Sequence, residues 1–128
     1  MTFLRTIAIA LLLNLPVHAQ PNPTAFDAWA ARLSNGALAV YATVNNPSMY
    51  DIYLVSGSSD AAGKIELISG DKPVSSITVP AYESVELKSG GAFVRWSDLK
   101  GQPKAGDEVK LTLVTDGGIA IAIAAVVK

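Results

Sequence analysis

Apolar and polar residues alternate with a period of two along much of this chain, as expected for β-strands with one face buried. The pattern is clearest over residues 108–115, where Val109, Leu111 and Leu113 fall on one face and polar side chains occupy the other. Further candidate strands cover 37–45, 50–56, 64–68, 76–79, 84–87 and 119–127. No helical period of 3.6 follows the first 20 residues, so the sequence predicts an all-β fold.

Turn-forming residues separate these strands. Asp116-Gly117-Gly118 is a strong hairpin signal between the last two strands. Pro80, which cannot donate to a central ladder, separates two short strands. The strand 119–127 alternates isoleucine with alanine, so we expect small apolar residues to pack closely on its second face as well. Many short strands joined by turns predict an antiparallel β-sandwich.

The first residues have the features of an export signal. Arg5 precedes an apolar run over 6–15, Pro16 ends that run, and residues 17–19 fit the small-x-Ala cleavage pattern. The apolar run is shorter than the roughly 20 residues that span a bilayer. Removal of the segment predicts a periplasmic or secreted protein with no membrane span, and a retained anchor is the alternative.

Cleavage is expected between Ala19 and Gln20. The expected organisation is then a signal peptide over 1–19, an extended leader over 20–24 and one β-domain over 25–128. The formal net charge of −1 and the scattered basic residues predict no nucleic-acid partner. With no cysteine, the domain must be stabilised by apolar burial rather than by disulfides.

Candidate catalytic chemistry is scarce. The single histidine, His18, lies in the predicted signal, and Met49 is the one methionine outside that signal. Without histidine the usual general base and the Ser-His-Asp arrangement are absent. We therefore expect no catalytic residues and no enzyme activity. A lone thioether makes a weak metal site, so Met49 is interpreted as a surface residue.

Several segments follow one another in the order and spacing of a known family. They are 79–81, 85–91, 98–100 and 103–113, joined more loosely by Asp27-Ala28-Trp29 with Arg32, Tyr41 with Asn45, and 58–67. Together they cover nearly all of 26–127, and the chain resembles the periplasmic copper chaperone family PCu(A)C. The resemblance implies a cupredoxin-like, Greek-key β-sandwich. It also implies copper as the family ligand, and delivery of copper to an exported or membrane-bound cuproenzyme.

The resemblance fails at the family's metal ligands. Ile68 stands where the family places a histidine, and Phe93 and Arg95 stand in place of a His-x-Met motif. The hairpin that carries a methionine ligand is shortened here. Imidazole and thioether donors select Cu(I), and these three side chains offer neither. We therefore expect no metal ligand and no bound cofactor at the usual site.

Phe93, Arg95 and Trp96 form a second candidate site. Aromatic and arginine side chains are enriched at protein contacts, so a former metal surface can become a docking surface. Alternatively, Phe93 fills the space that a ligand left. Two functions stay open: a copper-handling protein whose partner, a cuproenzyme or another copper-handling protein, completes the site, and a non-metal interaction module that kept the fold.

Overall fold

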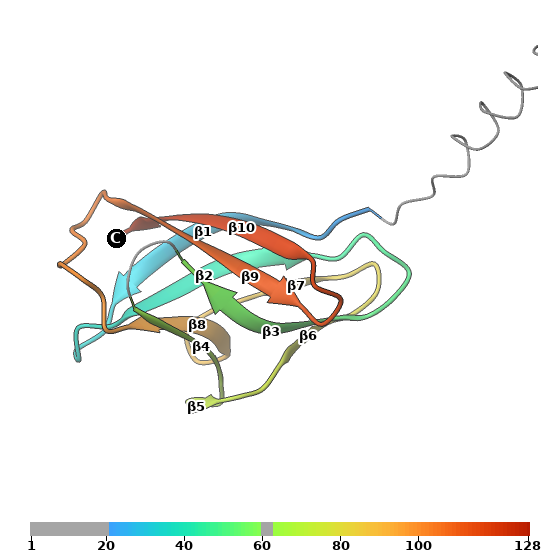
Figure 1. Ribbon diagram of the computed structural model, residues 1–128, viewed down its shortest axis with the longest axis horizontal. Helices are drawn as coiled ribbons and strands as arrows, with labels where there is room; N and C mark the ends of the chain where they lie inside the picture. The colour runs from blue at the N-terminus through green and yellow to red at the C-terminus, as the bar shows by residue number, and fades with distance from the viewer. Residues whose placement is uncertain (1–20, 60–62) are drawn as a thin grey trace, which may run out of the picture.

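The computed structural model describes residues 21–59 and 63–128, and they form an all-β domain (Figure 1). The predicted export signal, His18 and the junction between Ala19 and Gln20 lie outside the described residues. Within the described residues, no helix is long and apolar enough to cross a membrane.

Ten strands make up the described domain. In chain order they are β1 (Thr24–Arg32), β2 (Leu38–Asn45), β3 (Ile52–Ser58), β4 (Lys64–Ser69), β5 (Lys72–Pro73), β6 (Ile77–Val79), β7 (Ser84–Glu86), β8 (Ala92–Ser97), β9 (Glu108–Thr115) and β10 (Ala120–Val127). The hairpin predicted between the last two strands is confirmed, because the Gly118 amide donates to the Thr115 carbonyl at 2.9 Å.

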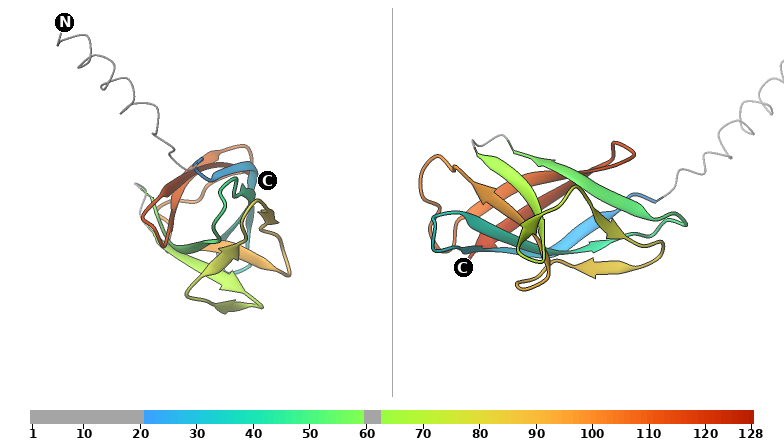
Figure 2. Two further views of the ribbon diagram at one scale, coloured as in Figure 1. Left: turned by 90° about the vertical axis from the view of Figure 1, so that its right-hand side faces the viewer. Right: turned by 90° about the horizontal axis from the view of Figure 1, so that it is seen from below.

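The strands form one sheet in the order β5-β4-β8-β2-β1-β10-β9-β3-β6, with β7 paired to β2 beside β8. The sheet curls around a single core, as the end-on view in Figure 2 shows. The all-β, cupredoxin-like fold class is confirmed, but the sheet is mixed. β1 pairs with β10 in parallel, with Trp29 opposite Val126. Alternation along a strand does not encode the direction of a distant partner, so the sequence pattern could not reveal this pairing.

The inner face of the curled sheet carries the core. Val94, Leu113 and Leu54 are 0% exposed, and Trp96 is 2% exposed. The predicted alternation of β9 is confirmed, since Leu111 and Leu113 are buried and the lysine between Val109 and Leu111 is exposed. Burial of this apolar surface is the main term that stabilises a domain without disulfides.

The close packing expected on the second face of the last strand is wrong. Ala120, Ala122 and Ala124 are exposed, whereas Ile121 and Ile123 are buried. β10 lies between β1 and β9, and the outer face of the sheet meets solvent at this strand. Alanine is small enough to be left exposed at little cost, so its presence did not require a second packed layer.

Three strands, β1, β8 and the two-residue β5, were not predicted from alternation alone. β8 holds four apolar or aromatic residues around Arg95, and β1 is interrupted by an irregularity. In β1 the register shifts between Phe26 and Trp29, and Asp27 between them has a φ of 54°. Such a bulge breaks the period of two, which is the signal on which strand prediction depends.

Candidate functional site

The three positions at which the resemblance places metal ligands lie together on the outer face of β4 and β8. Ile68 stands opposite Phe93, and Glu66 stands opposite Arg95. Residues two apart on a strand share a face, so all four side chains are on one side of this strand pair. The structure therefore brings together Ile68, Phe93 and Arg95, and it adds Glu66, which sequence reasoning missed. The sequence could have indicated Glu66, because it lies two residues before Ile68 and therefore on the same face of the strand.

An aromatic row crosses the same outer face. The ring centroids of Phe93 and Tyr41 are 5.8 Å apart, and those of Tyr41 and Trp29 are 4.7 Å apart. The Lys128 ammonium lies 5.0 Å from the Trp29 ring centroid, within the range of a cation–π contact. Phe93 therefore forms part of a packed row of rings, which supports the interpretation that it fills space on this face.

The bulge in β1 decides where Trp29 lies. Phe26 pairs with Thr43 and Trp29 pairs with Tyr41, so β1 uses three steps where β2 uses two. Without the extra residue, side chains three apart would point to opposite faces of the sheet. Asp27 provides the extra residue in the left-handed region, which aspartate tolerates better than most residues. The bulge thereby puts Trp29 on the outer face beside Tyr41.

Large aromatic side chains in a β-sandwich usually belong to its core. Tyr41 is 6% exposed, but Trp29 and Tyr41 both lie outside the main core cluster. Ile68 is likewise only 1% exposed and lies outside that cluster, paired with Phe93 on one side and with Pro73 of β5 on the other. The outer face of β1, β2, β8 and β4 therefore carries a second, smaller apolar layer.

Arg95 is held by Glu66. A guanidinium nitrogen of Arg95 donates to Glu66 Oε1 at 2.9 Å, and the two side chains are 29% and 20% exposed. The hydrogen bond from Arg95 lowers the pKa of Glu66 below its ordinary value, with the charges of Lys64 and Arg95 adding to the effect against partial desolvation. An ion pair therefore lies next to Ile68 and Phe93 on this face.

Trp96 does not belong to this surface, which corrects the predicted docking site. Its neighbours Arg95 and Phe93 have partly exposed side chains, but Trp96 is 2% exposed and belongs to the core. Adjacent residues on a strand point to opposite faces, so Arg95 and Trp96 cannot share a docking surface. Gly63 lies against the indole ring, where a Cβ atom would clash with Trp96.

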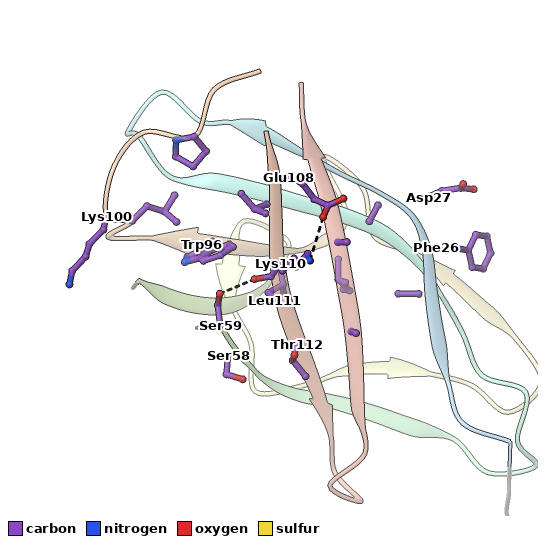
Figure 3. Close-up of a pocket in the computed structure, with 18 residues that line it drawn as sticks. Phe26, Asp27, Ser58, Ser59, Trp96, Lys100, Glu108, Lys110, Leu111 and Thr112 are labelled. Carbon is purple, nitrogen blue, oxygen red and sulfur yellow. Dashed lines mark hydrogen bonds and ion pairs between the residues drawn. The ribbon is translucent and has the colours of Figure 1, made fainter. Parts of the chain in front are cut away.

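A second feature is an open hollow of about 1070 Å³ beside the connection from β8 to β9 (Figure 3). Trp96, Leu111 and Thr112 contribute to its lining. Figure 3 shows Glu108 pointing toward Lys110, and this exposed ion pair measures 3.8 Å. The described side chains that line the hollow include no histidine, which is the usual general base.

The described residues offer little to a metal ion. In residues 21–59 and 63–128, no three histidine, cysteine, aspartate or glutamate side chains lie close enough together to hold one. On the outer face of β4 and β8, Ile68 and Phe93 provide no donor atom, and the carboxylate of Glu66 is bound by the Arg95 guanidinium, which has no acceptor of its own. The side chains on this face therefore do not fit Cu(I), which prefers sulfur and imidazole ligands.

A family model described as "Putative lipoprotein LpqE-like" matches residues 23–127. The chain belongs to the LpqE-like family. A comparison with curated proteins found no match.

Solved structures share the fold of this LpqE-like chain. The copper-bound PCuAC domain from PmoF2 is 19% identical, with a TM-score of 0.74 over 87% of this chain and 96% of that domain. The apo PCuAC domain from PmoF1 is also 19% identical, with a TM-score of 0.74 over 87% of this chain and 97% of that one. The solution structure of CuI-DR1885 from Deinococcus radiodurans is 27% identical, with a TM-score of 0.68 over 94% of this chain and 85% of that one. The predicted resemblance to PCu(A)C proteins is confirmed at the level of fold.

Proposed function

We propose that this chain is an exported LpqE-like protein that acts in copper delivery or cuproenzyme assembly without holding Cu(I) on the outer face of β4 and β8. The copper-bound relatives of the same fold support the association with copper. The proposed absence of Cu(I) binding is supported by the pairing of Ile68 with Phe93. Beside this pair, the Arg95 guanidinium is bound to Glu66.

The chemistry of these side chains opposes Cu(I) binding. The Arg95 guanidinium already binds the Glu66 carboxylate at 2.9 Å, and carboxylate oxygens are not the soft sulfur and imidazole donors that Cu(I) prefers. Met49, the one methionine outside the predicted signal, lies in the loop after β2 rather than on β4 or β8. Copper delivery by this chain would thus depend on donors from another protein, and the protein acts as a non-enzymatic partner.

The alternative is a protein-interaction module with no role in metal handling. The observation in its favour is a group of exposed aromatic and methionine side chains, Met49, Tyr50 and Tyr82, at one end of the domain. Such side chains are typical of contact surfaces.

Competition for Cu(I) tests the proposal. The exported protein is titrated with Cu(I) in the presence of a chromophoric chelator, and we expect no transfer of copper to the protein. Stoichiometric tight binding would refute the absence of a site. A triple variant, Ile68→His with Phe93→His and Arg95→Met, should gain measurable affinity because it supplies two imidazoles and one thioether.

Two controls make the titration decisive. Circular dichroism must first show that the triple variant is folded, because Ile68 is buried. The variant Tyr82→His then places one imidazole on a distant loop and should take no copper from the chelator. A folded triple variant that also fails to bind would show that the site is placed wrongly.

Export is the remaining part of the proposal. The predicted signal supports it, and the mass of the exported protein should correspond to a chain that starts at Gln20. The family description names a lipoprotein, but these 128 residues contain no cysteine that could be lipidated. A mass higher by one or more acyl chains would contradict the expectation that these residues carry no lipid.

A further inference from the structure

Three exposed apolar side chains gather in two adjoining loops at one end of the domain. Met49 is 52% exposed, Tyr50 is 64% exposed and Tyr82 is 71% exposed. The Tyr82 amide donates to the Ser48 carbonyl at 3.1 Å, which joins the loop after β2 to the turn before β7. Figures 1 and 2 show these two connections side by side at the end of the domain where β2 finishes. We call Met49, Tyr50 and Tyr82 the tyrosine platform.

A buried asparagine fixes the shape of the platform. Asn46 is 0% exposed, and its amide nitrogen donates to the carbonyls of Tyr50 at 2.7 Å, Val79 at 3.0 Å and Pro80 at 3.2 Å. Its oxygen accepts from the Ser48 hydroxyl at 2.7 Å. Both loops are thus tied to one side chain, and a preformed surface loses less conformational entropy when it binds.

The backbone at Tyr82 is strained. The Glu83 amide donates to the Pro80 carbonyl at 3.1 Å, and this bond closes a turn whose third residue, Tyr82, has a φ of 60°. That position favours glycine or asparagine, and a bulky aromatic there is an outlier. The side chain is largely in solvent, so packing does not account for a tyrosine at this position. A strained residue at an exposed site is a starting point for a functional hypothesis.

The charges around the platform have one sign. The loops 46–51, 80–83 and 116–118 contain Asp51, Glu83 and Asp116 and no lysine or arginine. Asp116 belongs to the same end, because its amide donates to the Tyr53 carbonyl at 2.9 Å. Three carboxylates beside exposed tyrosines favour a cationic partner, through both charge and cation–π contacts.

We propose that the tyrosine platform docks a segment of another protein that carries lysine or arginine side chains among apolar ones. An anionic lipid surface would be repelled by the three carboxylates. A second copy of this chain would bring the same carboxylates face to face across a two-fold contact. This partner is the one expected if the chain acts as the protein-interaction module described above. Its binding does not depend on copper.

Selection from a random 12-residue peptide library displayed on phage tests the proposal, with the exported protein as the immobilised target. We expect enriched peptides to be basic and to contain apolar residues. They should bind at least tenfold more weakly to Tyr82→Gly, which keeps the turn but removes the phenol, and more weakly to Asp51→Asn. Binding should be unchanged in Phe26→Ala, a matched control whose side chain is 48% exposed on β1.

Several outcomes would overturn the proposal. They are an absence of enrichment, enrichment of acidic or uncharged peptides, and peptide binding that Tyr82→Gly leaves intact. Binding of the unmutated protein to phosphatidylglycerol vesicles, lost in Tyr82→Gly, would assign the platform to a membrane instead. Concentration-dependent dimerisation lost in Tyr82→Gly would assign it to a second copy. Tyr82→Gly leaves Ile68, Phe93 and Arg95 untouched, so failure here is distinguishable from failure of the copper proposal.

Discussion

Ile68 on β4 lies directly opposite Phe93 on β8, and Ile68 is 1% exposed although it lies outside the main core. The pair ends an aromatic row that runs from Trp29 through Tyr41 to Phe93. At the positions where a copper ligand set is implied by family resemblance, the chain has built an apolar contact. Stability measurements therefore report on the packing at these positions.

The first prediction concerns that contact. Ile68→Ala should lower the free energy of unfolding by about 2 kcal/mol, near the low end for a buried isoleucine because the neighbouring β5 is a short edge strand. Urea denaturation measures the change. Val55→Ala is the matched control, since Val55 is 40% exposed and its truncation should cost less than about 0.5 kcal/mol. Equal losses in the two variants would mean that Ile68 is not packed as described.

The second prediction concerns the Arg95–Glu66 pair and pH. The bond from Arg95 lowers the folded-state pKa of Glu66, so the pair stabilises the fold fully above the unfolded pKa of about 4.3. That stabilisation is lost as pH falls through the lower folded pKa. Arg95→Met should therefore melt below the unmutated protein at pH 7, and the gap in Tm should close as the pH is lowered toward 3.

A control separates this effect from general charge loss. Lys110→Met removes the partner of Glu108 from an exposed pair in which the side chains are 77% and 53% exposed. Water screens such a pair, so its removal should leave Tm nearly unchanged at both pH values. A Tm gap for Arg95→Met that stays constant between pH 7 and pH 3 would argue against the proposed role of Glu66.

The third prediction concerns Asn46. Asn46→Ala should lower the free energy of unfolding by about 1–3 kcal/mol, because it removes a donor from the buried Val79 carbonyl and the acceptor of the buried Ser48 amide. The adjacent Asn45→Ala is the control, since the Asn45 side chain accepts one exposed hydrogen bond from Ser84. Chemical denaturation of both variants gives the comparison, and a larger loss for Asn45→Ala would contradict the assignment.

The fourth prediction concerns strain at Tyr82. Tyr82→Gly should raise the free energy of unfolding by about 1 kcal/mol, because glycine adopts a φ of 60° without steric cost. Ala81→Gly, one position earlier in the same turn, should instead lower it by about 0.4–1 kcal/mol through unfolded-state entropy. Thermal unfolding distinguishes the two. A destabilised Tyr82→Gly would show that the tyrosine is kept for folding rather than for contact.

Much of the fold follows from local sequence patterns. The strand at β9, its buried face and the following glycine turn match the structure because alternation and turn chemistry are local. β8, the bulged β1 and the two-residue β5 were not predicted, and the alanine face of β10 was wrongly expected to be covered. The positions Ile68, Phe93 and Arg95 were named from family order, but their contact with Glu66 and Tyr41 depends on strand register, which no short segment encodes.

The sequence by itself determined the fold class, the absence of cysteine and the absence of histidine outside the predicted signal. These properties depend on residue types and on local spacing. Only the tertiary structure decided that Trp96 lies in the core while Arg95 meets Glu66 outside it, and that β1 runs parallel to β10. It alone brought together the two loops that carry Met49, Tyr50 and Tyr82. Asn46 ties these loops, because its side chain bonds to carbonyls more than 30 residues away. The physical reason is that pairing between distant strands sets which side chains share a face, and that pairing minimises the free energy of the whole chain rather than of any segment.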